Sequence, residues 1–169
     1  MTRAEHILLA ALLAGGIVAL GRCVAPAKSN EIVGRVTVID GDTLESSDGT
    51  RIRLHGVDAF ETGQTCGSWA CGRIAANRLD EWLAETGSNV QCIAASKNVD
   101  RYGRTVARCA RYDGEDLGNW LVAHGYALDW PRYSHGEYAA AQLRAEKNKL
   151  GVWTVSDFWD TPWDWRKKK

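Results

Sequence analysis

Residues 31 to 58 place the strongest constraint on the fold of this chain. In EIVGRVTVIDGDTLESSDGTRIRLHGVD, apolar residues such as Ile32, Val36 and Val38 alternate with polar ones, as in strands that bury one face. The stretch SSDGT is rich in turn-forming residues, and the alternation resumes at Ile52 and Leu54. The pattern therefore predicts an antiparallel meander.

The remainder is predicted to be mainly helical, so the chain as a whole is α+β. Between Ala70 and Glu85, apolar residues recur at helical spacing, and Gly87 is placed to end that helix. Two further helices are predicted in EDLGNWLVAHG, residues 115–125, and GEYAAAQLRAEKNKLG, residues 136–151. Each of these ends in a glycine suited to the left-handed position after a helix.

The N-terminal 27 residues have the pattern of a targeting segment. Arg3 precedes an uncharged apolar run from Ile7 to Leu20, and Ala25-Pro26-Ala27 offers the small residues that a signal peptidase requires. We favour a cleaved signal peptide over residues 1–27, and an uncleaved membrane anchor is the alternative. The protein is therefore expected outside the cytoplasm, either periplasmic or secreted, or else anchored to the membrane by this segment.

Composition favours one globular domain and gives no overall sign of a nucleic-acid binder. Of the 169 residues, 45% are hydrophobic and 25% are charged, and the formal net charge is zero. Proteins that bind nucleic acid usually carry an excess of lysine and arginine. Any recognition of phosphate must therefore come from a local group of residues. The C-terminal residues 154–169 form a tryptophan-rich tail, which we expect either to fold back onto the core or to remain loose.

Four of the five cysteines lie beyond the targeting segment, and an even number is typical of disulfides in an oxidising compartment. Cys92 and Cys109 are placed symmetrically about the centre of CIAASKNVDRYGRTVARC, as expected for opposed positions of a hairpin. This symmetry favours a Cys92 to Cys109 bridge and leaves Cys66 to pair with Cys71. A zinc site is the alternative, but the CxxC pairs typical of such sites are absent from the sequence.

Several charged residues have the spacing of a phosphate-processing site. Asp42 in the turn DGD and Asp58 at the end of the next strand can meet as oxygen ligands for a divalent cation. Arg51, Arg53 and His55 are expected to share one face of their strand by its two-residue period, and an arginine fork suits phosphate oxygens.

Two more residues complete this set. Glu61, three residues after Asp58, is placed to orient or deprotonate water beside a metal, and Arg104 follows the hairpin turn. A metal, cations and a base are what hydrolysis of a phosphodiester requires.

The segments VIDGDTLE, IRLHGVDAFET, DRYGRTVA, LVAHGYA and AEKNKLGVW occur in the order and spacing typical of the staphylococcal-nuclease-like (thermonuclease) family. The resemblance covers residues 31–153. It implies a five-stranded OB-type β-barrel with three α-helices, and calcium-dependent hydrolysis of DNA and RNA.

By this resemblance, the carboxylates of Asp42 and Asp58 and the main-chain carbonyl of Ala59 are expected to bind Ca²⁺. Arg53 and Arg104 resemble the two phosphate-binding, catalytic arginines, and Glu61 resembles the general base. Tyr102 is expected to contact the nucleotide substrate.

The chain departs from the family pattern just before this glutamate. Ala59 and Phe60 stand where the family often has Thr and commonly has Pro, so Glu61 is expected to be held less firmly. The partner implied is a DNA or RNA substrate. We expect a monomer without a stable protein partner, and contact with a membrane only through an uncleaved N-terminal segment.

The sequence leaves two other functions open. One is a non-catalytic OB-type module that binds nucleic acid or protein in the cell envelope, and the other is an envelope protein that docks partners through its tail. The joint presence of the acids and arginines favours the enzyme.

Overall fold

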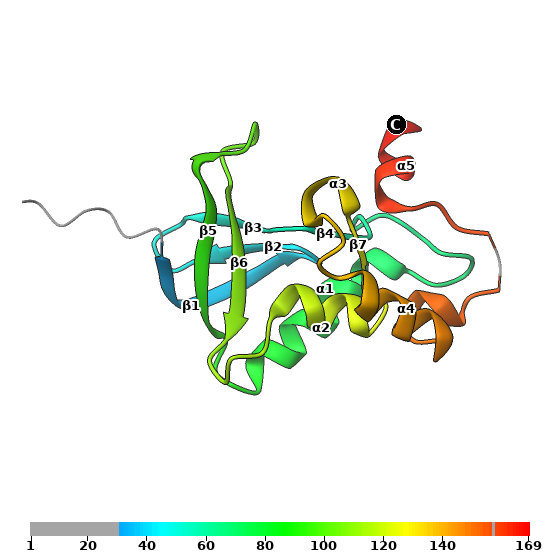
Figure 1. Cartoon of the computed structure of the whole chain (residues 1–169), viewed down its shortest axis with the longest axis horizontal. Coiled ribbons are helices and arrows are strands. Elements are labelled where there is room, and N and C mark those ends of the chain that lie inside the picture. The colour runs from blue at the N-terminus through cyan, green and yellow to red at the C-terminus, as the bar shows by residue number, and fades with distance from the viewer. Residues whose placement is uncertain (1–30, 157) are drawn as a thin grey trace, which may run out of the picture.

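The computed structural model of the protein describes residues 31–156 and 158–169, and the predicted targeting segment, residues 1–27, lies outside them. The fold contains a closed barrel with the strand order β1-β2-β3-β6-β5, which lies on the left in Figure 1. Its strands are β1 (Glu31–Asp40), β2 (Thr43–Ser46), β3 (Arg51–Leu54), β5 (Asn89–Val99) and β6 (Thr105–Arg111). Neighbours pair antiparallel except β3 and β6, which are parallel. The predicted meander and the five-stranded barrel are confirmed.

Helices cover the barrel where the amphipathic patterns predict them. In the described part of the chain, three helices have seven or more residues, namely α1 (Cys71–Ala84), α2 (Leu117–Ala123) and α4 (Ala139–Lys147). α1 buries Ala75, Leu79 and Leu83 on one face. Gly125 adopts a positive φ angle directly after the cap of α2, as predicted. After α4 the left-handed position is taken by Lys149, and Gly151 has its positive φ angle two residues later. Within the described residues no helix is both long and apolar enough to cross a bilayer.

Several short elements were not predicted from the sequence. β4 (Val57–Ala59) pairs antiparallel with β7 (Ala127–Asp129) in a separate two-stranded sheet. The others are α3 (Pro131–Ser134), the 3-10 helix η1 (Gly151–Thr154) and α5 (Pro162–Lys167). Elements this short carry too few residues for a periodic pattern to identify them.

Both expected disulfides are present in the structure. Cys92 and Cys109 lie directly opposite each other on β5 and β6 and are bonded. Cys66 and Cys71 form a second bridge across the loop that leads into α1. This second bridge belongs to a small apolar cluster, separate from the barrel core, with Phe60, Leu128 and Val152.

The tryptophan-rich tail folds back onto the domain. Trp159 and Trp163 pack against the small cluster, and the Trp159 ring lies edge-on 5.5 Å from Phe60 and 5.2 Å from Trp153. Of the two conformations expected for the tail, the structure has the folded-back one. This packing places α5 beside β4, which carries Asp58.

Candidate active site

Asp42 reaches the site from the tight turn between β1 and β2. A Cβ atom on Gly41 would lie 2.6 Å from the Cβ of Ala59, so only glycine lets this turn approach β4 so closely. Asp42 Oδ2 accepts a 2.7 Å hydrogen bond from the backbone N–H of Ala59. The DGD motif is therefore a turn, and it also joins Asp42 to the strand that carries Asp58.

Arg53 joins the two aspartates. Its Nη2 lies 3.0 Å from Asp42 Oδ2 and 2.9 Å from Asp58 Oδ1. Its Nη1 donates hydrogen bonds of 2.9 Å to the carbonyls of Leu54 and Val57. These contacts hold the guanidinium in one orientation.

The strand face expected to carry three cations is not uniform. Arg51 is exposed and lies 3.4 Å from Glu45, whereas Arg53 is only 8% exposed. His55 is half-buried, and burial lowers its pKa. Arg53 is buried because carboxylates from two neighbouring elements cover it.

Asp58 is fully buried and has a second cationic partner that the sequence analysis did not identify. Arg166 of α5 donates to both carboxylate oxygens, from Nη1 to Oδ1 at 3.1 Å and from Nη2 to Oδ2 at 2.7 Å. The same Nη1 lies 2.6 Å from Glu61 Oε1. One guanidinium thus spans the expected metal ligand and the expected general base.

Burial sets the titration of the two aspartates. It raises the pKa of Asp42 to about 7, although the charge of Arg53 acts in the opposite direction. Burial also raises the pKa of Asp58, against the lowering effect of Arg166 and Arg53. Taking carboxylates out of water is costly unless positive charge compensates them. The ionised forms of Asp42 and Asp58 therefore depend on positive charge close to them, which Arg53 and Arg166 supply.

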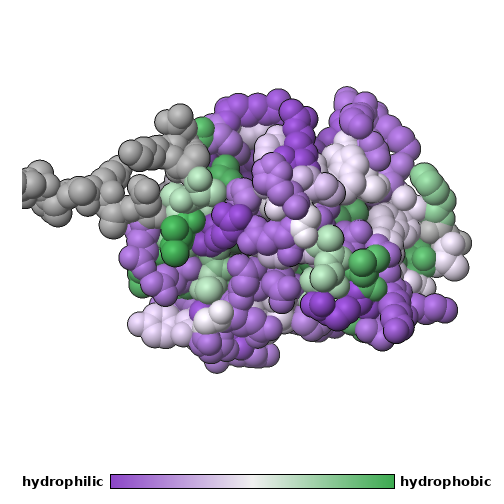
Figure 2. Space-filling view, viewed as in Figure 1, coloured by the Kyte–Doolittle hydropathy of each residue, from purple (hydrophilic) through white to green (hydrophobic). Residues whose placement is uncertain are grey.

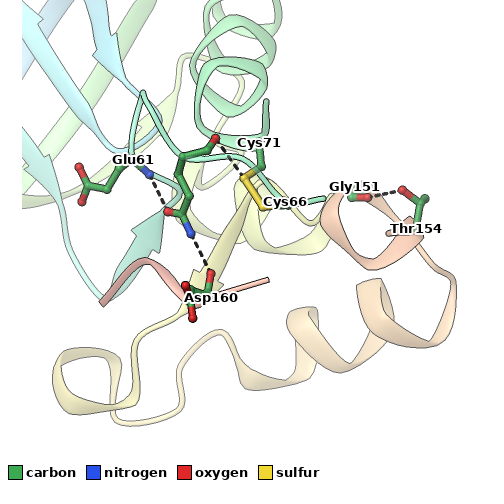
Figure 3. The surroundings of a disulfide bond; sticks show 7 residues. Glu61, Cys66, Cys71, Gly151, Thr154 and Asp160 are labelled. Carbon is green, nitrogen blue, oxygen red and sulfur yellow. Dashed lines mark hydrogen bonds between the residues drawn. A yellow bond between two sulfur atoms is a disulfide. The ribbon is translucent and has the colours of Figure 1, made fainter. Parts of the chain in front are cut away.

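Glu61 is placed by backbone and loop contacts. Its N–H donates to Gln64 Oε1 at 3.2 Å, and Gln64 Nε2 donates to the carbonyl of Asp160 at 2.8 Å. Figure 3 shows Glu61 and Asp160 joined through these bonds beside the disulfide. A Cβ on Gly72 would lie 1.7 Å from the Glu61 carbonyl oxygen, so α1 packs directly on this backbone. These contacts and the buried Phe60 supply restraints where the family proline is missing.

Arg104 and Tyr102 come from the turn between β5 and β6. Arg104 Nε lies 2.9 Å from Asp100 Oδ2, and its Nη1 donates to Thr43 Oγ1 at 3.1 Å. Burial raises the pKa of Asp100, but hydrogen bonds from Arg104 and Tyr102 outweigh this and hold it below its usual value. Asp100 therefore stays ionised and fixes Arg104. The Tyr102 ring lies 5.2 Å from the Arg104 guanidinium and is 64% exposed.

All the residues expected at the site line a single cleft of about 360 Å³. They are Asp42, Arg53, Asp58, Ala59, Glu61, Tyr102 and Arg104. Arg166 and Trp130 also line it and were missed, since no local pattern distinguishes them. Residues that are far apart in the chain thus come together as the resemblance implies.

A larger groove of about 890 Å³ adjoins this cleft and shares several of its residues. Cationic and aromatic side chains line it, among them Arg101, Tyr102, Arg132, Tyr133, Trp163 and Lys167. The tip of the β5–β6 hairpin and helix α5 project as two hydrophilic lobes with a notch between them (Figures 1 and 2). Basic grooves with exposed rings are typical of surfaces that bind single-stranded nucleic acid.

The acids of the cleft offer oxygen ligands for a divalent cation. Among residues 31–156 and 158–169, no group of three or more His, Cys, Asp or Glu side chains is arranged to hold a metal. Asp42 and Asp58 nevertheless present carboxylate oxygens to one shared nitrogen, Arg53 Nη2. Calcium binds such oxygens together with backbone carbonyls and water, so the chemistry of the two carboxylates suits this ion.

Known proteins similar to this chain include nucleases of the family that the sequence motifs resemble. Residues 51–155 match the family described as staphylococcal nuclease homologue. The succinoglycan biosynthesis protein ExoI of Rhizobium meliloti is 40% identical over 127 residues, which is 72% of this chain and 64% of that protein, less than two thirds of its length. An uncharacterized endonuclease of Escherichia coli O157:H7 is 31% identical, over 85% of this chain and 91% of its own length. A micrococcal nuclease of Shigella flexneri is 30% identical over 78% of each chain.

These matches confirm the resemblance drawn from the sequence motifs and, with the closed barrel, the OB-type α+β fold. The match to the family covers more than half of the chain. This protein therefore belongs to the family of staphylococcal nuclease homologues.

Proposed function

We propose that the protein is a calcium-dependent nuclease that hydrolyses phosphodiester bonds of DNA or RNA. The observation that carries this proposal is the single cleft that gathers two buried acids, two arginines and Glu61. Relatives named endonuclease and micrococcal nuclease support it. A binding module would not need this combination of groups in one cleft.

Asp42, Asp58 and the carbonyl of Ala59 are the groups that would hold calcium. When bound, the ion supplies positive charge that stabilises the phosphoryl oxygens as negative charge builds on them. Arg53 Nη2 contacts one oxygen of each acid and so holds the two carboxylates side by side, which supports their role as joint ligands.

Arg53 and Arg104 are proposed to bind the phosphoryl oxygens. Planar guanidinium groups suit such oxygens because each can donate two parallel hydrogen bonds. Arg53 is held by two carbonyls and Arg104 by Asp100, so both side chains are oriented before substrate arrives. Such preorganisation stabilises charge that develops in the transition state.

Glu61 is proposed to accept a proton from the attacking water. In this step the water oxygen bonds to phosphorus, the bond from phosphorus to one sugar oxygen breaks, and that oxygen takes up a proton. The 37% exposed carboxylate of Glu61 is open to solvent on the cleft side, which is what a base for water requires.

The adjoining groove would carry the rest of the polynucleotide. Tyr102, Tyr133 and Trp163 offer rings for base stacking, and Arg101, Arg132 and Lys167 offer charge to the backbone. Because net charge is zero, binding should depend on this local set and weaken strongly with salt. The two disulfides support a place outside the cytoplasm for this activity.

The direct test is cleavage of single- and double-stranded DNA and RNA by the purified protein, with calcium or with chelator. We expect cleavage in calcium only. Binding of nucleic acid without cleavage in calcium would indicate the non-catalytic module instead, and equal cleavage in chelator would exclude the metal.

Two substitutions separate the metal from the base. Asp42→Asn should weaken calcium binding, and added calcium should restore part of the activity. Glu61→Gln should lower turnover by about 10²- to 10⁴-fold without rescue by calcium. Glu81→Gln, on the exposed surface of α1, is the matched control and should cleave normally. Single-turnover cleavage and calorimetric titration measure both effects, and near-normal turnover by Glu61→Gln would reject its role as base.

A further inference from the structure

The C-terminal helix brings a guanidinium into the active site at the point where the acids meet. We propose that Arg166 is an active-site residue that competes with the divalent cation for Asp58, while it also pairs with Glu61, so that cation binding requires Arg166 to withdraw. This inference rests on the proposed function, since the proposed function assigns Asp58 to the metal.

The competition follows from the oxygens that Arg166 uses. It bonds both oxygens of Asp58, at 3.1 and 2.7 Å, and Glu61 Oε1 at 2.6 Å. Asp58 is fully buried, and Arg53 holds its Oδ1 as well, at 2.9 Å. A cation that took a place on Asp58 would need the oxygens and the space that the Arg166 guanidinium occupies.

Arg166 is the partner that can leave. Its side chain is 37% exposed, whereas that of Asp58 is fully buried on β4. α5 has only six residues, and the helix is capped at its start by Thr161, whose Oγ1 accepts from the Asp164 N–H at 3.3 Å. A short surface helix of this kind can separate from the domain at low cost compared with a barrel strand.

The tail is nevertheless held close to the site by contacts that do not involve the acids. Trp159 packs on Phe60 and Trp153, and the Asp160 carbonyl accepts a 2.8 Å hydrogen bond from Gln64 (Figure 3). These anchors keep Arg166 at high local concentration near Asp58, so it acts as an intramolecular competitor.

The size of the effect follows from the fraction of molecules in which Arg166 is away from the site. The apparent affinity for a ligand falls by the fraction of the protein that is competent to bind it. Hydrogen bonds between charged groups, discounted for the partial exposure of Arg166, favour the form in which Arg166 contacts Asp58 by about 10-fold. Removal of this side chain should therefore raise calcium affinity by about 10-fold.

The test is calorimetric titration of the full chain with calcium alone, for the parent and for Arg166→Gln. Lys168→Gln is the matched control, because it removes one positive charge from the end of the same helix, and Lys168 pairs with Asp160 at 2.7 Å, outside the cleft. We expect tighter binding of about 10-fold for Arg166→Gln and a change below about 2-fold for Lys168→Gln.

A second measurement on the parent needs no substitution at the site. The Arg166 guanidinium lies 5.4 Å from the Trp130 ring, and Trp163 stacks on the same ring. Calcium should therefore change tryptophan emission and speed hydrogen exchange of the α5 amides. Unchanged exchange in α5 at saturating calcium would overturn the inference.

The outcomes separate this inference from the proposed function. If the parent and Arg166→Gln cleave in calcium but bind it with equal affinity, the competition is wrong and the nuclease assignment stands. Weaker calcium binding by Arg166→Gln would also overturn the competition, because Arg166 would then support the metal site. If the parent and both variants neither bind calcium nor cleave, the proposed function itself fails.

Discussion

Replacement of Arg53 by glutamine should destabilise the calcium-free protein by about 3 kcal/mol. Arg53 is the only side chain bonded to both Asp42 and Asp58 among the described residues, and its removal leaves Asp42 buried without its cation. Loss of one partner of a buried ion pair typically costs about 3 to 5 kcal/mol. The lower end applies because Arg166 still pairs with Asp58.

The loss should also depend on pH. Since burial raises the pKa of Asp42 to about 7, the folded state holds this proton more tightly than the unfolded chain does. At pH 5 the folded protein keeps Asp42 largely neutral and needs Arg53 less, whereas at pH 8 the carboxylate is ionised. The cost of Arg53→Gln should therefore be smaller at pH 5 than at pH 8.

Urea unfolding in chelator measures these differences. Arg51→Gln is the matched control, since it removes an exposed arginine from the same strand and should cost less than about 0.5 kcal/mol. In a double-mutant cycle with Asp42→Asn, we expect a coupling of about 2 kcal/mol. Coupling below about 0.5 kcal/mol would refute the reasoning, because the two buried charges would then not depend on each other.

Two further predictions concern the frame around the site. Replacement of both Cys92 and Cys109 by serine should lower the free energy of unfolding by about 3 kcal/mol, because the bridge closes a loop between residues 17 positions apart. Thermal unfolding with and without reductant measures this loss, and an unchanged melting temperature would contradict it. Gly72→Ala should lower the rate of cleavage by about 10²-fold, because the Cβ of the new alanine would displace the Glu61 backbone. Gly63→Ala is the control and should cleave normally, because a Cβ at this position meets no atom within 4 Å. Equal rates in these two glycine variants would show that the packing of α1 does not position the base.

The sequence by itself determined the barrel, its hairpin and the longer helices. Strand alternation between residues 31 and 58 and the helical spacing between Ala70 and Glu85 are local patterns, and each forces one face toward a core. The symmetric placement of Cys92 and Cys109 correctly predicted that the two cysteines oppose each other, but the register closer to the turn differs, because it shifts between Ala94 and Val99 and Val99 pairs with Thr105. Every site residue expected from the family motifs lines one cleft in the structure.

Only the tertiary structure decided how that cleft is filled. Arg53 is buried because Asp42 and Asp58 reach it from two other elements. Arg166 meets Asp58 across 108 positions of the chain, through a helix of six residues that is too short to carry a periodic signal. Contacts at such separations depend on the packing of Trp159 and Phe60, and no local pattern of residues specifies them.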